Sequence, residues 1–164
     1  MSACDFVVVE TGESHGLPWV IIQLRDDDGP RHMCGYVGVP SSHPWHSCDY
    51  GQATPGAVRE AAEAACWDEA MYAIQHATDY DLTPAGRAEV HGGLTWADRH
   101  PSCGEDERAS WWFGFDAAHA GDLSSPNEHP RPEFGANWYA TYKDAAYMRR
   151  ECESLARQLS EVTA

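Results

Sequence analysis

Short apolar runs separated by turn residues make up the first forty positions of the chain. Residues 6–9, 18–24 and 33–39 are rich in β-branched and aromatic side chains, which favour strands. Residues 13–16 and 26–30 lie between these runs and carry the Gly, Pro, Asp and Ser residues typical of turns. The pattern therefore predicts an antiparallel meander of three strands.

Helical patterns follow in two later segments. Residues 57–75 come directly after Pro55 and Gly56 and are rich in Ala and Glu, which predicts one helix. A second, amphipathic helix near the C-terminal end has Thr141 as its expected N-cap and includes Lys143. It is predicted by apolar residues that recur at spacings of four and three positions: Met148, Cys152, Leu155, Leu159 and Val162.

Two more strands are expected in the second half of the chain. Residues 89–97 hold a glycine pair within an extended pattern, and residues 111–115 form an aromatic run typical of a buried strand. Residues 124–136 contain three prolines and are expected to form an irregular loop.

The length of 164 residues suits one domain with one main core. We predict a single α+β domain over residues 1–164, with a mainly antiparallel sheet and the long C-terminal amphipathic helix. The helix at 57–75 belongs to residues 54–84, which we interpret as a helical insertion.

The net charge of the chain disfavours some classes of function. The chain has 26 acidic and 11 basic residues, a formal net charge of -15 at pH 7. Such a charge repels phosphate, so direct binding to nucleic acid or to an anionic membrane is not expected. No apolar run approaches the roughly 20 residues that span a bilayer, and no basic leader segment is seen, so we expect a cytoplasmic protein. An enzyme, a small-ligand binder and an acidic protein that docks on a basic partner all remain open.

The six cysteines include no C-x-x-C pair, and without a secretory signal we expect them to be reduced. Cys66 and Cys152 fall on apolar faces of the predicted helices, where they would be core residues. A zinc site formed by two cysteines and two histidines has unusual spacing and is not favoured. Its candidate ligands are Cys34, His43, His46 and Cys48.

The loop at residues 40–51 contains most of those candidate ligands. A loop of this length is often functional. We interpret it as a wall of a ligand pocket, with His43 and Trp45 as ligand-binding residues and Trp45 and Tyr50 as stacking surfaces.

The sharpest chemical motif is Asp116-x-x-His119-x-x-Asp122 at the end of a predicted strand. Two carboxylates around an imidazole bind a divalent metal through oxygen and nitrogen, and the three residues are therefore candidate metal ligands. They also suit acid–base catalysis, with His119 or Asp116 as the general base. The structural alternative is that Asp116 caps a turn, His119 packs on a tryptophan and Asp122 is solvated.

A second candidate lies in the segment of residues 89–97. His91 precedes Gly92 and Gly93, and Thr95 follows them. Glycine inside a strand often marks a bulge or the close approach of a ligand, so these four residues are predicted to bind a ligand together with Asp122. The alternative is that the glycines make room for tryptophans and that His91 donates to a strand-end carbonyl.

Three motifs carry a resemblance: G-Y-V-G-V-P-x-x-H-P at 35–44, V-H-G-G-L-T-W at 90–96 and W-W-F-G-F-D-A-A-H-A-G-D at 111–122. The chain resembles small uncharacterised proteins encoded by phages and prophages of actinobacteria. The resemblance implies an accessory role in the cytoplasm of an infected host and supplies no established activity.

Two functional hypotheses follow from the motifs and this context. The first is a site for a small molecule or a divalent metal, where the ligand is a nucleotide-derived host signal that is sequestered or hydrolysed. The second is an acidic protein that inhibits a host nucleic-acid-binding protein. A third alternative is an oligomer, such as a homodimer, whose motifs only determine folding.

Overall fold

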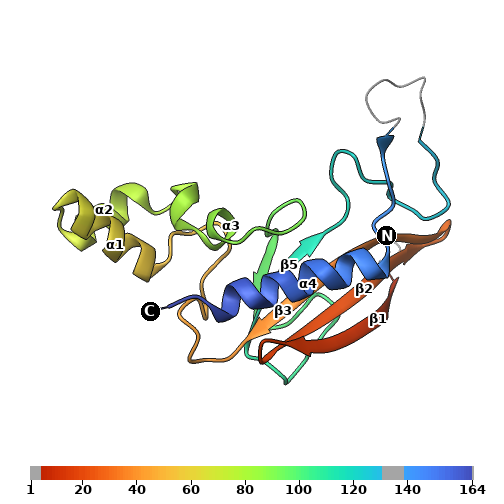
Figure 1. The fold of residues 1–164 in the computed structure, drawn as a ribbon, viewed down its shortest axis with the longest axis horizontal. Helices are drawn as coiled ribbons and strands as arrows, with labels where there is room; N and C mark the ends of the chain where they lie inside the picture. Colours follow the sequence, from red (N-terminus) through yellow and green to blue (C-terminus); the bar gives the residue numbers. More distant parts are fainter. Residues whose placement is uncertain (1–4, 131–138, 164) are drawn as a thin grey trace.

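Antiparallel strands form the sheet that positions the rest of the chain (Figure 1). The computed structural model describes residues 5–130 and 139–163. Within them the strands are β1 (Asp5–Ser14), β2 (Leu17–Asp26), β3 (Gly29–Val39), β4 (Trp96–Asp98) and β5 (Trp111–Asp116). Their order in the sheet is β1-β2-β3-β5-β4, and every neighbouring pair is antiparallel. The expected α+β fold with a mainly antiparallel sheet is confirmed.

The first three strands form the predicted meander. β1 and β2 are joined at His15 and Gly16, whose φ values of 54° and 75° suit a tight hairpin turn. The β2–β3 connection is also short, and Asp26 accepts a hydrogen bond from the Asp28 N–H at its start. β1 is longer than the predicted run at 6–9 and lies at one edge of the sheet.

Helix α4 (Ala145–Ser160) packs across one face of the sheet (Figure 1). Its buried residues include Met148, Cys152, Leu155 and Leu159, so the amphipathic pattern is confirmed. Burial of one such leucine stabilises the fold by about 1.5–3 kcal/mol. The helix nevertheless begins later than predicted.

The N-cap of α4 is Asp144, because its carboxylate accepts from the Tyr147 N–H at 2.9 Å. The expected Thr141 cap is wrong, since Thr141 pairs with Asp122 in an isolated parallel bridge. Lys143 consequently precedes the helix and does not lie within it.

The opposite face of the sheet is covered by the loop between β4 and β5. Cys103 and Ala109 of this loop pack against a second, smaller core that contains Tyr36 and Trp112. Ser102 also hydrogen-bonds to the Tyr36 hydroxyl. Because both faces are covered, most residues of β2, β3 and β5 are buried.

Two helices replace the single helix predicted at 57–75. They are α1 (Pro55–Ala65) and α2 (Glu69–His76). Cys66 ends α1 with φ 55° and ψ 39°, a left-handed conformation that stops the helix. It is exposed, so its expected place in the core is wrong, whereas Cys152 is buried as expected.

Local interactions explain why α2 begins where it does. The Asp68 carboxylate accepts from the N–H groups of Ala70 and Met71 at 3.1 Å. Trp67 packs on Tyr72 with ring centroids 5.8 Å apart, a hydrophobic staple across the start of the helix. The short η1 (Tyr80–Leu82) and α3 (Pro84–Arg87) then return the chain to the sheet.

The expected strand at 89–97 is mostly a turn. Gly92 and Gly93 have φ values of 68° and 85°, which a regular strand does not allow, and the Gly93 N–H donates to the Val90 carbonyl. Only its end, Trp96 and Ala97, belongs to β4. The irregular loop predicted at 124–136 lies partly outside the described residues. None of the described helices is long and apolar enough to cross a membrane.

Candidate functional site

The motif at 116–122 folds into a turn directly after β5. The Asp122 N–H donates to the His119 carbonyl at 2.9 Å, and the Asp122 carboxylate accepts from the His119 N–H at 3.0 Å. A parallel bridge to Thr141 holds the end of this turn beside the segment that leads into α4. The turn therefore aims the carboxylate inwards, and the Asp122 side chain is only 2% exposed.

His91 reaches this carboxylate from the other side. Its Nε2 lies 2.7 Å from Asp122 Oδ2, and its Nδ1 lies 2.9 Å from the Tyr147 hydroxyl. Because an ionised carboxylate only accepts, Nε2–H donates to Asp122, and in the neutral imidazole Nδ1 then accepts from the Tyr147 O–H. The backbone N–H of His91 also donates to Glu151 at 2.8 Å, which fixes the turn on α4.

Three residues of this site were missed by the sequence predictions: Lys143, Tyr147 and Glu151. Lys143 Nζ lies 3.4 Å from Asp122 Oδ1 and 5.4 Å from the centre of the Tyr147 ring. The three residues are spaced by four positions, so Tyr147 and Glu151 share one face of α4. That spacing is visible in the sequence, but polar residues beside an apolar stripe are also typical of the solvated face of an amphipathic helix.

The environment keeps Asp122 ionised. Burial alone would raise the pKa of this carboxyl group. Hydrogen bonds from the His91 ring and the His119 N–H, together with Lys143, outweigh burial and hold the pKa of Asp122 below its ordinary value. The site is therefore built around one buried negative charge.

His119 adds a second imidazole beside that charge. Its Nδ1 lies 3.9 Å from Asp122 Oδ2 and 3.7 Å from Asp116 Oδ1. Nδ1 is buried, and among the described residues no side chain or backbone group hydrogen-bonds to it. A buried ring nitrogen without a partner is costly in a folded protein, and a bound ion or water would satisfy it.

Gly92 makes room for that imidazole. A Cβ placed on Gly92 would collide with Cε1 and both nitrogens of the His119 ring. Gly93, in contrast, has nothing within 4 Å of such an atom. Of the two glycines, only Gly92 therefore makes room for an imidazole, and that imidazole belongs to His119.

His91, His119 and Asp122 form a group that could hold a metal ion. Their candidate ligand atoms all lie within 4.8 Å of one another. Tetrahedral coordination with bonds of about 2.0–2.1 Å would separate neighbouring ligand atoms by about 3.3 Å. The observed separations from Asp122 Oδ2, 2.7 Å to His91 and 3.9 Å to His119, bracket that value. Small side-chain movements would therefore create the geometry.

Asp116 lies beside this group and outside it. Its carboxylate accepts from Thr95 Oγ1 at 3.1 Å and from the Ala118 N–H at 3.0 Å. Asp116 and Thr95 also line a small cavity of about 280 Å³ together with His32. Burial lowers the pKa of His32, which keeps its imidazole neutral there. Of the predicted metal ligands, His119 and Asp122 thus join His91, while Asp116 faces the neighbouring cavity.

His43 and Trp45 lie at the far end of α4. The His43 Nε2–H donates to the Leu159 carbonyl at 2.8 Å. Leu159 follows Tyr147 by twelve positions, about 18 Å along a helix axis. The structure therefore does not bring His43 or Trp45 together with His91 and Asp122.

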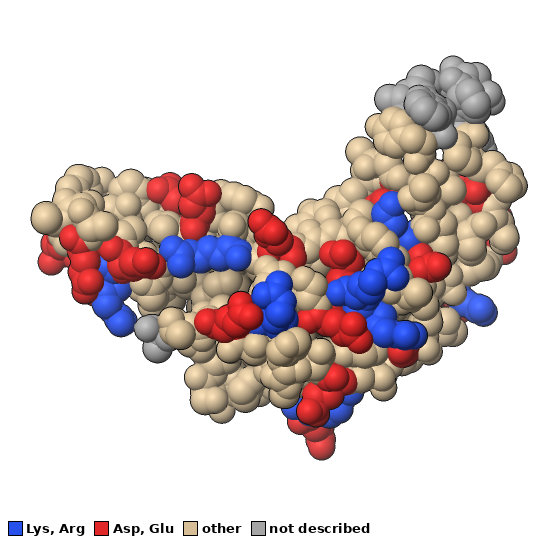
Figure 2. All heavy atoms as spheres, viewed as in Figure 1, with Lys and Arg blue, Asp and Glu red and all other residues tan. Residues whose placement is uncertain are grey.

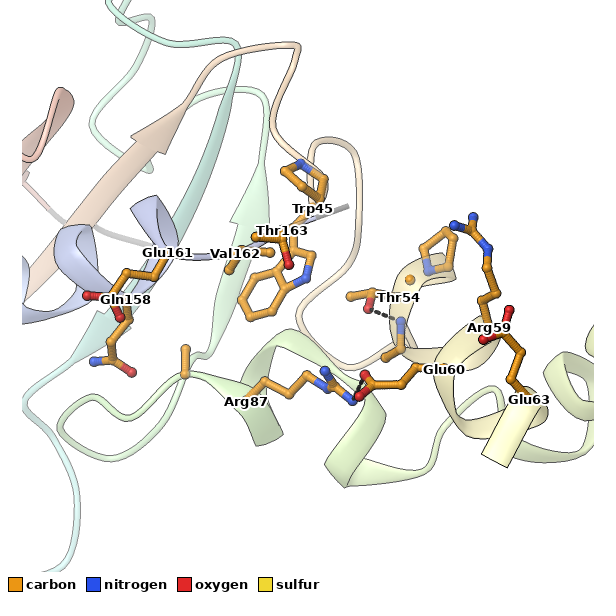
Figure 3. A pocket seen from close by; sticks show the side chains of 15 residues that line it. Trp45, Thr54, Arg59, Glu60, Glu63, Arg87, Gln158, Glu161, Val162 and Thr163 are labelled. Atoms are coloured by element: carbon orange, nitrogen blue, oxygen red, sulfur yellow. Dashed lines mark hydrogen bonds and ion pairs between the residues drawn. The ribbon is translucent and has the colours of Figure 1, made fainter. Parts of the chain in front are cut away.

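Trp45 does line a cavity of its own. Figure 3 shows it between the start of α1 and the end of the chain at Val162 and Thr163, in a cavity of about 740 Å³. Only 6% of Trp45 is exposed, because its ring packs edge-on against Phe113. Arg87 and Glu60 form an ion pair at the rim.

The unfavoured zinc set does not assemble. Cys34 packs in the smaller core on the face opposite α4, whereas His43 contacts α4 itself. Burial raises the pKa of the Cys34 thiol to about 12, which opposes the thiolate that zinc requires. The described cysteines are all free, as expected for reduced thiols.

Neither protein-family models, nor curated proteins, nor solved structures gave a match to this chain.

Proposed function

We propose that the protein binds a divalent transition-metal ion through His91, His119 and Asp122. Two imidazoles and one carboxylate form a ligand set that suits Zn²⁺ and Fe²⁺ and leaves coordination positions open for water or a small ligand. The observation that carries the proposal is the convergence of the three ligand atoms within 4.8 Å around a buried carboxylate.

The surroundings of the group support metal binding in two further ways. The buried Nδ1 of His119 has no hydrogen-bond partner among the described groups, so ligation of a metal by this nitrogen breaks no hydrogen bond. Tyr147 stands behind His91, and metal-bound histidines usually hold such a partner on their other nitrogen. Once Nε2 ligates a metal, Nδ1 carries the proton and donates it to the Tyr147 oxygen.

Asp116 links the group to the neighbouring cavity, which it lines together with His32 and Thr95. Asp116 is then placed to act as the general base, because its Oδ1 is 3.7 Å from His119 Nδ1. His119, as a ligand, would not serve as the base. The nucleotide-derived ligand, hydrolysis and the phage context all remain predictions.

Titration calorimetry with Zn²⁺ tests the proposal on the intact, reduced chain. We expect one site, and a loss of affinity of about tenfold or more, or about 1.4 kcal/mol, in His119→Ala and in Asp122→Asn. His46→Ala removes an imidazole from the loop at 40–51 and is the matched control, because it should retain full affinity. Equal affinity in all four proteins would exclude the site.

The free thiols need their own control, since they also bind zinc. Co²⁺ absorption separates the two donor sets, because thiolate ligation adds an intense charge-transfer band. The His–Asp group should bind Co²⁺ without this band. A strong band that persists in His119→Ala would assign the metal to cysteines.

The hydrogen bonds around His91 favour a second candidate function, acid–base catalysis. Tyr147, His91 and Asp122 form a relay in which the tyrosine hydroxyl donates to the imidazole and the imidazole donates to the carboxylate. This arrangement suits acid–base catalysis without a metal. One nitrogen cannot serve both functions, because His91 Nε2 either carries the proton or ligates the ion.

The tautomer of His91 therefore discriminates the two functions. Long-range ¹H–¹⁵N spectra report which ring nitrogen is protonated. We expect the proton on Nε2 without metal and on Nδ1 after Zn²⁺ is added. A proton that stays on Nε2 under saturating Zn²⁺ would favour the relay.

A further inference from the structure

The outer side of α2 exposes apolar residues that nothing described in the chain covers. Met71 is 53% exposed and Ile74 is 75% exposed, and α2 has no buried residue. Trp67, directly before the helix, is 48% exposed. Isolated exposed apolar residues are ordinary, but Met71 and Ile74 share one face of α2, and Trp67 lies beside its first turn, so the three form a surface.

The outer face of α2 differs from the face that carries Tyr72 and His76. The Trp67 ring borders both faces, because its centroid lies 5.8 Å from that of Tyr72 and 6.1 Å from that of His76. Tyr72 and His76 are partly buried, and their rings stack with centroids 4.1 Å apart. Met71 and Ile74 are three positions apart and so share another face of the helix. The helix is thus apolar on two sides, while folding uses only one.

The charge around this surface is strongly negative. Residues 54–87 contain six acidic residues and two arginines, a net charge of -4. Both arginines are already paired, Arg59 with Glu69 and Arg87 with Glu60. Figure 2 shows carboxylate side chains gathered over the part of the molecule where α1 and α2 lie. Asp68 and Asp79 flank the helix itself.

We infer that Trp67, Met71 and Ile74, here the α2 outer surface, dock a basic amphipathic helix of a partner protein. Residues at helical spacing pack best against the side chains of another helix, because ridges on one fill the grooves of the other. Lysines or arginines beside the partner's apolar stripe would meet the surrounding carboxylates. This inference is independent of the proposed metal site.

Other occupants fit the charge less well. A second copy of this chain would bring the same net charge of -4 against itself, in a protein whose formal charge is -15. An anionic lipid surface would be repelled for the same reason. A basic partner also agrees with the expectation of an acidic protein that docks on a host protein.

Fluorescence anisotropy with two labelled synthetic peptides tests the inference on the full chain. One peptide is an 18-residue amphipathic helix of Leu and Lys, and the other replaces every Lys with Glu. We expect saturable binding of the Leu–Lys peptide alone. Met71→Ser and Ile74→Ser should each weaken that binding about tenfold or more, and added salt should weaken it further.

Val8→Ser is the matched control, because Val8 is also apolar and 52% exposed but lies on β1. It should bind the peptide as the unchanged protein does. Circular dichroism checks folding, and Ile74→Gln replaces any variant that unfolds. Equal binding by the Ile74 variant and the unchanged protein would overturn the inference. So would loss of binding in Val8→Ser, or self-association or binding to anionic vesicles that Ile74→Ser abolishes.

Discussion

The imidazole of His119 occupies the space that a side chain on Gly92 would fill. The two residues come from different parts of the chain, one from the turn before β4 and the other from the turn after β5. Their contact places His119 against His91, with ring centroids 5.7 Å apart. The absence of a side chain at one position thus sets where a candidate metal ligand stands at another.

Gly92→Ala should displace the His119 ring and weaken Zn²⁺ binding about tenfold or more. Gly93→Ala is the matched control, because Gly93 also has a positive φ but no neighbour within 4 Å of an added Cβ. Both substitutions carry a similar left-handed strain of about 1–2 kcal/mol, so the difference between them isolates the collision. Calorimetry of both variants measures it, and identical affinities would contradict the role given to Gly92.

Tyr147→Phe should weaken Zn²⁺ binding by about 10–100-fold without removing a ligand. The reason is that the Tyr147 hydroxyl is the hydrogen-bond partner of His91 Nδ1 and so orients the ring. Tyr142→Phe is a control on the same segment, since its hydroxyl bonds to Gln23 and to the Arg31 carbonyl at the sheet. If both variants bind Zn²⁺ as tightly as the unchanged protein, Tyr147 does not support the site.

Periodic signals in the sequence predicted the fold where one period dominates. The stripe from Met148 to Leu159 located α4 because each apolar position meets the sheet. Amino-acid composition alone gave a wrong prediction where residues that end and restart a helix interrupt a helix-favouring segment. The Ala- and Glu-rich segment predicted one helix, although Asp68 as a cap and Trp67 with Tyr72 as a staple indicate a new start.

The candidate site was predictable only in part. His119 and Asp122 follow from their spacing, and His91 was a separate candidate. Their convergence could not be predicted, because it depends on the turns before β4 and after β5 meeting at α4. The paired glycines at 92 and 93 were expected to lie inside a strand, although two adjacent glycines also indicate a turn.

Cys66→Gly should stabilise the protein by about 0.5–1 kcal/mol. Cys66 adopts φ 55° at the end of α1, a conformation that glycine adopts without the steric cost of a Cβ. Its side chain is exposed, so little packing is lost. Cys66→Ala removes the thiol but keeps the Cβ and is the control. Urea unfolding of both variants should show the gain for glycine alone.

The His43 ring should make the fold sensitive to mild acid. Its Nε2–H donates to the Leu159 carbonyl, and its Nδ1 accepts from the Trp45 N–H at 3.0 Å. Protonation of Nδ1 would place its N–H opposite the Trp45 N–H, so that two hydrogen-bond donors face each other. Burial lowers the pKa of His43 below the 6.5 of an unfolded chain, and the nearby His46 acts in the same direction, although the bond to Leu159 opposes them.

The sign of the pH effect follows from this order of pKa values. Below about pH 6.5 the unfolded chain binds a proton at His43, whereas the folded protein binds it only at lower pH. The stability that His43 contributes is therefore complete above pH 6.5 and is lost as the pH falls. His43→Gln should cost about 1–2 kcal/mol at pH 7 through the disrupted hydrogen bonds, and less at pH 5. Urea unfolding at both pH values measures the difference. His129→Gln, at an exposed position, should change the free energy of unfolding by the same amount at both pH values. A His43→Gln penalty that is equal at both pH values would rule out His43 as an acid-sensitive contact.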